Sequence, residues 1–168
     1  MEMLPGNAHA VASPPTSPDP ILLGEDLVRV RAGAWRLLVP MRFVERIHGA
    51  ALPAARPSGG APAAPVVAVG PEELLPVVFA EALLGAAEVR LSAAQQMVQL
   101  GERGRRALLW VDAVEDVVGH APRQAPPEGP GPDGLVACWS GDSLPLAVID
   151  VPRLLELASG PPERKEAP

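Results

Sequence analysis

Histidine and cysteine are the residues of this sequence best able to bind a metal or act as a nucleophile, and their spacing favours neither role. His9, His48 and His120 lie far apart, and none has a His, Cys or Asp partner at the spacing of metal ligands. The only cysteine, Cys138, stands among apolar residues, which favours a small buried side chain and excludes an internal disulfide. We therefore expect no metal site.

Paired acidic residues and serines are the remaining candidates for catalysis. The acidic pairs at 72–73 and 115–116 are adjacent in sequence, and adjacent residues of a strand point to opposite faces, so neither pair converges on one substrate bond. Ser92, Ser140 and Ser143 have no nearby histidine with an orienting acid. The glycine-rich stretches lack the lysine and following Ser or Thr of a phosphate-binding loop. The sequence therefore predicts a protein that is not an enzyme and has no cofactor.

Composition bounds the size of the protein and its partners. The chain has 168 residues, the size of one domain. Its formal net charge is −6 and Lys165 is its only lysine, so it lacks the basic stripe that binds nucleic acid. The longest uncharged stretch, 57–71, is broken by proline and glycine and is shorter than the roughly 18 apolar residues that span a bilayer. With no signal-peptide core near the N-terminus, we expect a cytoplasmic protein without membrane insertion.

Proline and glycine set the expected domain boundaries. The sequence has 16 glycines and 22 prolines, yet 48% of its residues are hydrophobic, so a core is expected between the proline-rich stretches. Residues 1–21 and 159–168 are predicted to be disordered tails, and 22–158 to be the folded domain. Inside that domain, 53–65 and 122–134 are predicted loops, long enough to bind a ligand.

The apolar periodicity between these stretches is mostly that of β-strands. Val28 and Val30 alternate with arginines before a turn at 32–33, which predicts a hairpin. The four predicted strand pairs are 27–31 with 35–39, 66–69 with 75–78, 97–100 with 107–111, and 135–140 with 144–149. Helices are predicted at 81–87 and 152–158. Many short strands at regular spacing indicate a barrel or a sandwich.

Four segments of the sequence together resemble one known family. Residues 39–49 resemble a strand that ends in proline before a Val-x-Glu-Val/Ile turn, and 66–78 resemble an apolar strand, a turn and a strand with the motif Val-Pro-Val-Ile. Residues 111–117 resemble Val-Asp-x-Val-x-x-Val, and 149–155 resemble Leu-Asp-x-x-x-Leu-Leu. These blocks occur in the order found in CheW-like chemotaxis coupling proteins and span nearly all of the predicted domain.

The resemblance implies a fold and a role. The implied fold is mainly β, with two small, pseudo-symmetric, five-stranded β-barrel (SH3-like) subdomains that share a hydrophobic core, and short helices. The implied role is that of a non-catalytic adaptor. Its partners would be the cytoplasmic tip of a chemoreceptor, the regulatory domain of a CheA-type histidine kinase and other CheW-like proteins, within receptor arrays.

Family positions implicated in coupling give the expected partner contacts. They are Val44, Arg46, Ile47, Val69 and Val117. The three apolar residues Val44, Ile47 and Val117 are equally compatible with core positions of the barrels. Arg46 stands where the family has glutamate and Val69 where it has arginine, so the charge of the partner surface is expected to differ from that of the family.

Three functions stay open at the level of the sequence. The first is the full adaptor. The second is a partial adaptor or modulator that binds only receptor or only kinase, because Val69 and Phe79 replace the arginine and aspartate of the family. The third is a ligand-binding or enzymatic β-barrel whose site lies in a groove between the loops at 53–65 and 122–134.

Overall fold

The structure is a computed structural model that describes residues 25–55, 65–119, 133–139 and 145–160. Its strands are β1 (Leu27–Ala32), β2 (Trp35–Pro40), β3 (Val44–Gly49), β4 (Ala54–Ala55), β5 (Pro65–Ala68), β6 (Leu74–Phe79), β7 (Gln96–Glu102), β8 (Arg105–Val111), β9 (Ala113–Val118), β10 (Leu135–Trp139) and β11 (Leu146–Ile149). Its helices are a 3-10 turn (Met41–Phe43), α1 (Ala80–Leu83) and α2 (Val151–Ser159). The predicted tail 1–21 and residues 161–168 lie outside the described residues.

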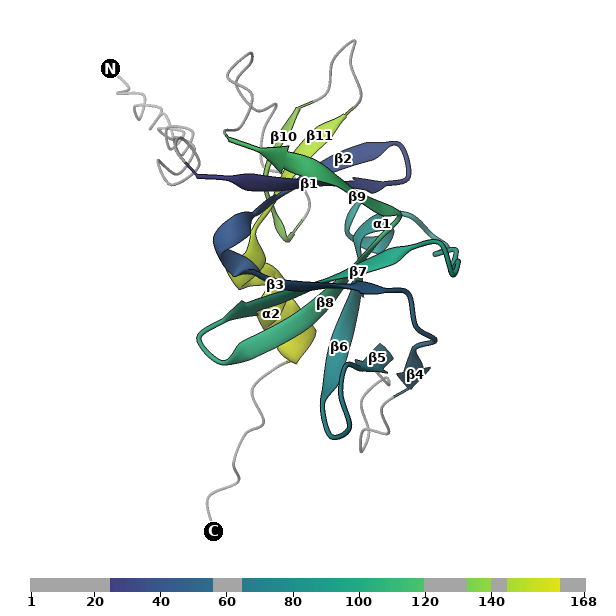
Figure 1. Ribbon diagram of the computed structural model, residues 1–168. Helices are drawn as coiled ribbons and strands as arrows, with labels where there is room; N and C mark the ends of the chain where they lie inside the picture. The colour runs from purple at the N-terminus through teal and green to yellow at the C-terminus, as the bar shows by residue number, and fades with distance from the viewer. Residues whose placement is uncertain (1–24, 56–64, 120–132, 140–144, 161–168) are drawn as a thin grey trace, which may run out of the picture.

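The strands form two sheets that share one pairing pattern (Figure 1). The first sheet has the order β10–β11–β2–β1–β9, and the second has β5–β6–β8–β7–β3 with β4 added beside β5. Each contains one parallel pair, β11 with β2 or β6 with β8, among antiparallel pairs. The mainly β, pseudo-symmetric fold is therefore confirmed. One detail differs, because within the described residues the outer strands of each sheet do not pair with each other and neither unit closes into a barrel.

All four predicted hairpins are present in the structure. The hairpin between β7 and β8 is tighter than predicted, because Glu102 pairs with Arg105 and the turn consists of Arg103 and Gly104 alone. Both turn residues have positive φ, 49° and 79°, as a two-residue hairpin turn with the twist of the strands requires. The periodicity did not predict β3, β4 or β9, and β4 lies inside the predicted loop 53–65.

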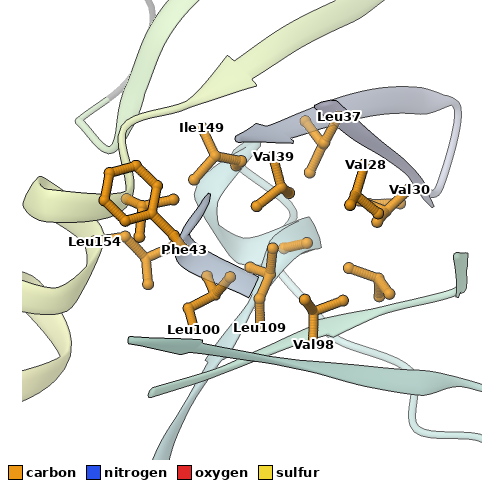
Figure 2. Packing of buried hydrophobic residues seen from close by; sticks show 14 of the residues in the cluster. Val28, Val30, Leu37, Val39, Phe43, Val98, Leu100, Leu109, Ile149 and Leu154 are labelled. Atoms are coloured by element: carbon orange, nitrogen blue, oxygen red, sulfur yellow. The ribbon is translucent and has the colours of Figure 1, made fainter. Parts of the chain in front are cut away.

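A hydrophobic core lies between the two sheets (Figure 2). Side chains alternate along β8: Ala107, Leu109 and Val111 face this shared core, whereas Leu108 and Trp110 face the other side of the sheet. The second side carries its own buried cluster, which is Val67, Leu75, Val77, Met97, Leu108 and Trp110. The shared core between two subdomains is thus confirmed, and sheet two is buried on both faces.

The predicted closing helix is present as α2. Asp150 precedes its first turn and its Oδ1 accepts a hydrogen bond from the backbone N–H of Arg153 at 3.0 Å, which caps the helix. Pro152 occupies the first turn, where its missing N–H costs nothing. Leu154 and Leu155 are buried in the shared core. Although α2 follows β11 of sheet one, it packs against β6, β7 and β8 of sheet two, so it joins the two sheets.

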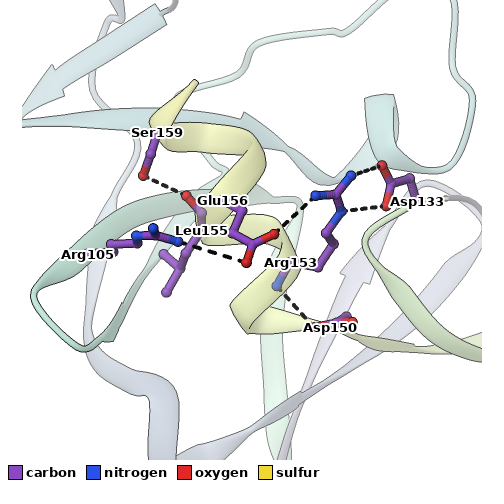
Figure 3. Close-up of polar contacts among 7 residues, drawn as sticks. All are labelled: Arg105, Asp133, Asp150, Arg153, Leu155, Glu156 and Ser159. Carbon is purple, nitrogen blue, oxygen red and sulfur yellow. Dashed lines mark hydrogen bonds and ion pairs between the residues drawn. The ribbon is translucent and has the colours of Figure 1, made fainter. Parts of the chain in front are cut away.

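Arg153 ties α2 to the residue that precedes β10 (Figure 3). Its guanidinium donates two hydrogen bonds to Asp133, at 2.8 and 2.9 Å, and a third to Glu156 at 3.1 Å. Hydrogen bonding to Arg153, aided by its positive charge, lowers the pKa of Asp133. The Asp133 carboxylate is therefore expected to stabilise the fold only in its ionised form.

Asp133→Asn is expected to lower the melting temperature at pH 7 and to have no effect in strong acid. A carboxyl group whose folded pKa is depressed stabilises the fold above its unfolded pKa, about 3.9, and that contribution is lost as the pH falls through the folded pKa. Thermal unfolding of both proteins between pH 7 and pH 2 measures this. A difference in melting temperature that is constant over this range would show that the ion pair contributes nothing.

Candidate functional site

The five predicted partner-contact residues lie in three places. Val44, Arg46 and Ile47 are on β3, Val117 is on β9, and Val69 directly follows β5. β3 and β9 are each the outermost strand of their sheet within the described residues, so their outer backbone edges have no partner strand there. Four of the five predicted contact residues therefore lie on edge strands, where another chain can approach.

Ile47 and Val117 continue the shared core outward to the surface. Ile47 lies opposite Val98 and Val117 lies opposite Val28, and directly paired residues of neighbouring strands point to the same face. Val98 and Val28 are buried in the shared core, yet Ile47 is 45% and Val117 52% exposed. These two residues, here called the apolar rim, are thus not core residues. Val44 is half-buried and packs against the shared core.

Arg46 and Val69 belong to a different feature, a polar pocket of about 310 Å³. We call it the ionic pocket. Its lining residues are Glu45, Arg46, Val69, Glu73, Gln99 and Arg106. Arg46 lies opposite Gln99, which points away from the shared core, so this pocket is on the other side of β3 from the apolar rim. The structure therefore brings Arg46 and Val69 together and separates them from Ile47 and Val117.

A hydrogen-bonded chain crosses the ionic pocket. Gln99 is only 8% exposed, and its amide nitrogen donates to Glu45 at 2.7 Å. Its carbonyl oxygen therefore faces His48, whose Nε2 donates to it at 2.8 Å. Both ends of this buried amide are satisfied, so Gln99 fixes the direction of the Glu45 carboxylate.

Arg106 bridges the two carboxylates of the ionic pocket. Its guanidinium lies 2.8 Å from Glu73 and 3.2 Å from Glu45. The hydrogen bond with Glu73 and the charges of both glutamates raise the pKa of Arg106. Within the described residues, Arg46 makes no ion pair, and the two arginines and two glutamates of the lining sum to zero charge.

Gly101 makes room for Glu45. The pairing of β3 with β7 shifts by one residue between Val44 and Arg46, which leaves Glu45 as the extra residue of a β-bulge. A Cβ atom added at Gly101 would overlap Oε1 of Glu45 and lie 2.6 Å from its Cδ. The carboxylate thus occupies the space that any other residue at 101 would fill.

Gly101→Ala is expected to displace the Glu45 carboxylate from Gln99 and Arg106 and to change the unfolding free energy by less than about 1 kcal/mol, because the methyl group meets only the end of a flexible side chain and alanine lowers the entropy of the unfolded chain. Urea denaturation measures the stability, and the NMR signals of the Gln99 side-chain amide report the displacement. Gly49→Ala on β3 is the matched control, since a Cβ there meets nothing within 4 Å. An unmoved Gln99 signal in Gly101→Ala would contradict the packing argument.

A second pocket, of about 260 Å³, is apolar. Its lining residues are Ala50, Ala51, Leu52, Pro53, Leu91, Ser92, Ala93 and Trp110. Leu52 is 91% exposed, whereas Trp110 is buried and its indole N–H donates to Gln95 at 2.8 Å. Trp110 is thus a core residue of the second cluster, and Trp35 packs against the shared core. The side chains of Trp139 and Cys138 lie outside the described residues.

The described residues include few of the side chains that an enzyme or a metal site would need in one place. The lining of the ionic pocket includes no serine, cysteine or histidine. Among the described side chains, no three His, Cys, Asp or Glu residues gather as metal ligands would. The groove proposed between loops 53–65 and 122–134 lies mostly outside the described residues. No helix in the described part of the chain is long and apolar enough to cross a membrane.

Sequence reasoning missed Gln99, Glu73 and Arg106 as members of the site. Gln99 gave a usable signal, because it is a polar residue between Val98 and Leu100 in a predicted strand, and a buried polar side chain needs partners. No local pattern in the sequence indicates Arg106, because its contact with Glu73 joins residues that are 33 positions apart.

Comparison with known proteins shows a likeness at the level of the fold. The sequence matches no protein-family model and no curated protein. Among solved structures, the chain is similar to the scaffolding protein CheW from Thermoanaerobacter tengcongensis, with a TM-score of 0.59 and 14% sequence identity. The similarity covers 79% of this chain and 92% of that protein. At this level of identity, the likeness shows the fold.

Proposed function

We propose that this chain, which has the CheW fold, is a non-catalytic chemosensory adaptor that couples a chemoreceptor to a CheA-type histidine kinase. Its partners would be the cytoplasmic tip of the receptor and the regulatory domain of the kinase, and it would work in the cytoplasm within receptor arrays. The fold of a scaffolding protein supports this proposal at the level of the family. The four sequence blocks that resemble CheW-like proteins support it independently.

The single observation that carries the proposal is the apolar rim. Ile47 and Val117 are among the few large apolar side chains that the described residues expose, and both stand on outer strands. An apolar residue that extends a core to the surface is suited to anchor a partner, because a few such residues supply most of the binding energy of an interface. The resemblance to CheW-like proteins also gives both as partner contacts.

A binding titration tests the adaptor function. The full chain is titrated calorimetrically with the kinase regulatory domain and, separately, with a receptor tip fragment from the same organism, at low and physiological salt. Micromolar binding to both partners is the expected result. If the folded protein binds neither, the adaptor function is wrong and a ligand-binding role for the fold has to be considered.

A partial adaptor is the second candidate, and the ionic pocket favours it. Arg46 and Val69, which stand where the resemblance expects glutamate and arginine, lie in one pocket, so the two changes alter a single surface. A surface altered as a unit is consistent with loss of one partner and retention of the other. Competition against an ordinary CheW-like coupler distinguishes the two candidates, because a partial adaptor would displace it and lower kinase activity.

A further inference from the structure

We propose that this chain pairs with a second copy of itself through the second pocket described above, here called the apolar pocket, with Leu52 of each copy seated in the apolar pocket of the other. The contact is two-fold symmetric, so the same insertion of a side chain into a pocket occurs twice. This pairing goes beyond the adaptor function and does not rest on it, because it concerns the chain alone.

Leu52 is the side chain that projects. It is the most exposed large hydrophobic residue in the described part of the chain, at 91%. Leu52 stands between β3 and β4, and the next residue, Pro53, favours an extended backbone at Leu52. A leucine presented in this way keeps nearly all of its apolar surface in water, and a partner that buries this surface gains the hydrophobic driving force.

The apolar pocket has the size to receive a leucine side chain. Its volume is about 260 Å³, whereas a cavity of about 150 Å³ is enough to hold a benzene ring. A leucine side chain has four carbon atoms and is smaller than that ring. The pocket therefore has room for one leucine of a partner.

Hydrogen bonds hold the apolar pocket in shape. One wall comes from residues 50–53 and the other from 91–93, and the backbone N–H of Ala50 donates to the carbonyl oxygen of Gln95 at 3.1 Å. The side-chain oxygen of Gln95 accepts from the indole N–H of Trp110 at 2.8 Å and from the backbone N–H of Ser92 at 2.7 Å. Both walls and the buried indole are thus joined at one residue. A pocket that is already formed costs little ordering when it is filled.

Charge favours a second copy as the occupant. The chain has a formal net charge of −6, so two copies repel each other across much of their surfaces. The lining of the apolar pocket contains no charged residue, whereas four of the six residues that line the ionic pocket are charged. Two copies can therefore meet at the apolar pocket without bringing like charges into contact.

The position of Leu52 favours a symmetric pair. Leu52 is itself one of the residues that line the apolar pocket, so the projecting side chain and the pocket adjoin on one copy. A single two-fold rotation then seats both leucines at once. An unrelated partner would have to supply a matching pocket and a matching side chain, and a second copy carries both. Because the contact uses both features of each copy, it closes at the dimer.

Sedimentation equilibrium of the full chain, from low to high micromolar concentration, tests the pairing. Wild type is expected to form a reversible dimer. Leu52→Ser is expected to raise its Kd about 100-fold, because the symmetric contact loses two anchors. Leu74→Ser is the matched control and should dimerise as wild type, since Leu74 on β6 is 60% exposed and lines neither pocket.

Ala93→Met distinguishes a seated side chain from a nonspecific apolar contact. Ala93 lines the apolar pocket, so methionine there fills the space that Leu52 of the other copy needs. We expect the Kd of the dimer to rise about tenfold. Equal or tighter pairing of Ala93→Met would overturn the proposal. So would a monomer at every concentration, species larger than a dimer, or equal effects of Leu52→Ser and Leu74→Ser.

The NMR signal of the Trp110 indole N–H locates the contact in wild type, without a variant. We expect it to shift with protein concentration, following the Kd from sedimentation, while the indole signal of Trp35, which lines neither pocket, stays in place. A Trp110 signal that ignores concentration and moves only when the kinase regulatory domain is added would overturn the pairing and leave the adaptor function standing.

Discussion

Replacing Ile47 and Val117 together by threonine is expected to weaken binding to the receptor tip fragment about 100-fold, with a melting temperature close to that of wild type. Each side chain is about half exposed and stands on an outer strand, so each can supply an anchor of roughly 1 to 2 kcal/mol to an interface. Threonine keeps the β-branched shape that strands favour, so the fold should tolerate the change. Titration calorimetry and thermal unfolding measure the two quantities.

The single variants show whether the apolar rim acts as one surface. If Ile47→Thr and Val117→Thr each weaken the same partner, and their effects add, the partner spans both sheets. Leu157→Ala on α2 is the control, because Leu157 is 43% exposed and lies outside the rim. If the rim variants bind as tightly as Leu157→Ala, the rim is ordinary exposed surface and the proposed function loses its main support.

Leu154→Ala is expected to have the largest effect on stability, a loss of about 2 to 5 kcal/mol in the unfolding free energy. Leu154 is fully buried in the shared core, on a helix that follows sheet one and packs against sheet two. The cavity left by the missing methyl groups therefore weakens the junction of the two sheets. Most of the 5 to 15 kcal/mol that stabilises a typical domain depends on such contacts.

Urea denaturation measures this effect, with Leu157→Ala on the same helix as the matched control. Both variants keep a good helix former, so a difference between them reports burial alone. A single transition with a lower midpoint is expected, because the core is shared by both sheets. A cost below about 1 kcal/mol, or two separate transitions, would show that the sheets are stabilised independently.

The hairpins could be predicted from the sequence because each combines strand periodicity with a local turn. β3 and β9 were missed for a shared physical reason. Each contains a β-bulge, at Glu45 and at Glu115, where an extra residue interrupts the alternation of buried and exposed side chains. The period of two, which is the signal of a strand, is therefore lost within six residues.

The candidate site was less predictable than the fold. The resemblance selected Arg46 and Val69 one by one, but their meeting in one pocket depends on Gln99 and Arg106, which belong to other strands. Such a grouping is set by the register of pairing between strands and has no local signature. The exposure of Ile47 likewise follows from its strand being outermost, which its neighbours in sequence do not reveal.

The path of the chain through the two sheets has a consequence for biosynthesis. All strands of sheet two, β3 to β8, are consecutive, whereas sheet one combines β1 and β2 with β9, β10 and β11. On the ribosome, β2 must therefore wait for β11, whose pairing residues are roughly 110 positions later. At 5 to 20 residues per second this delay is about 6 to 22 s. The apolar face that β1 and β2 turn toward sheet two can be covered earlier, once β8 has been made, roughly 70 residues after β2. The order of the strands therefore predicts that sheet two can form during synthesis, whereas the pairing of β2 with β11 closes sheet one last.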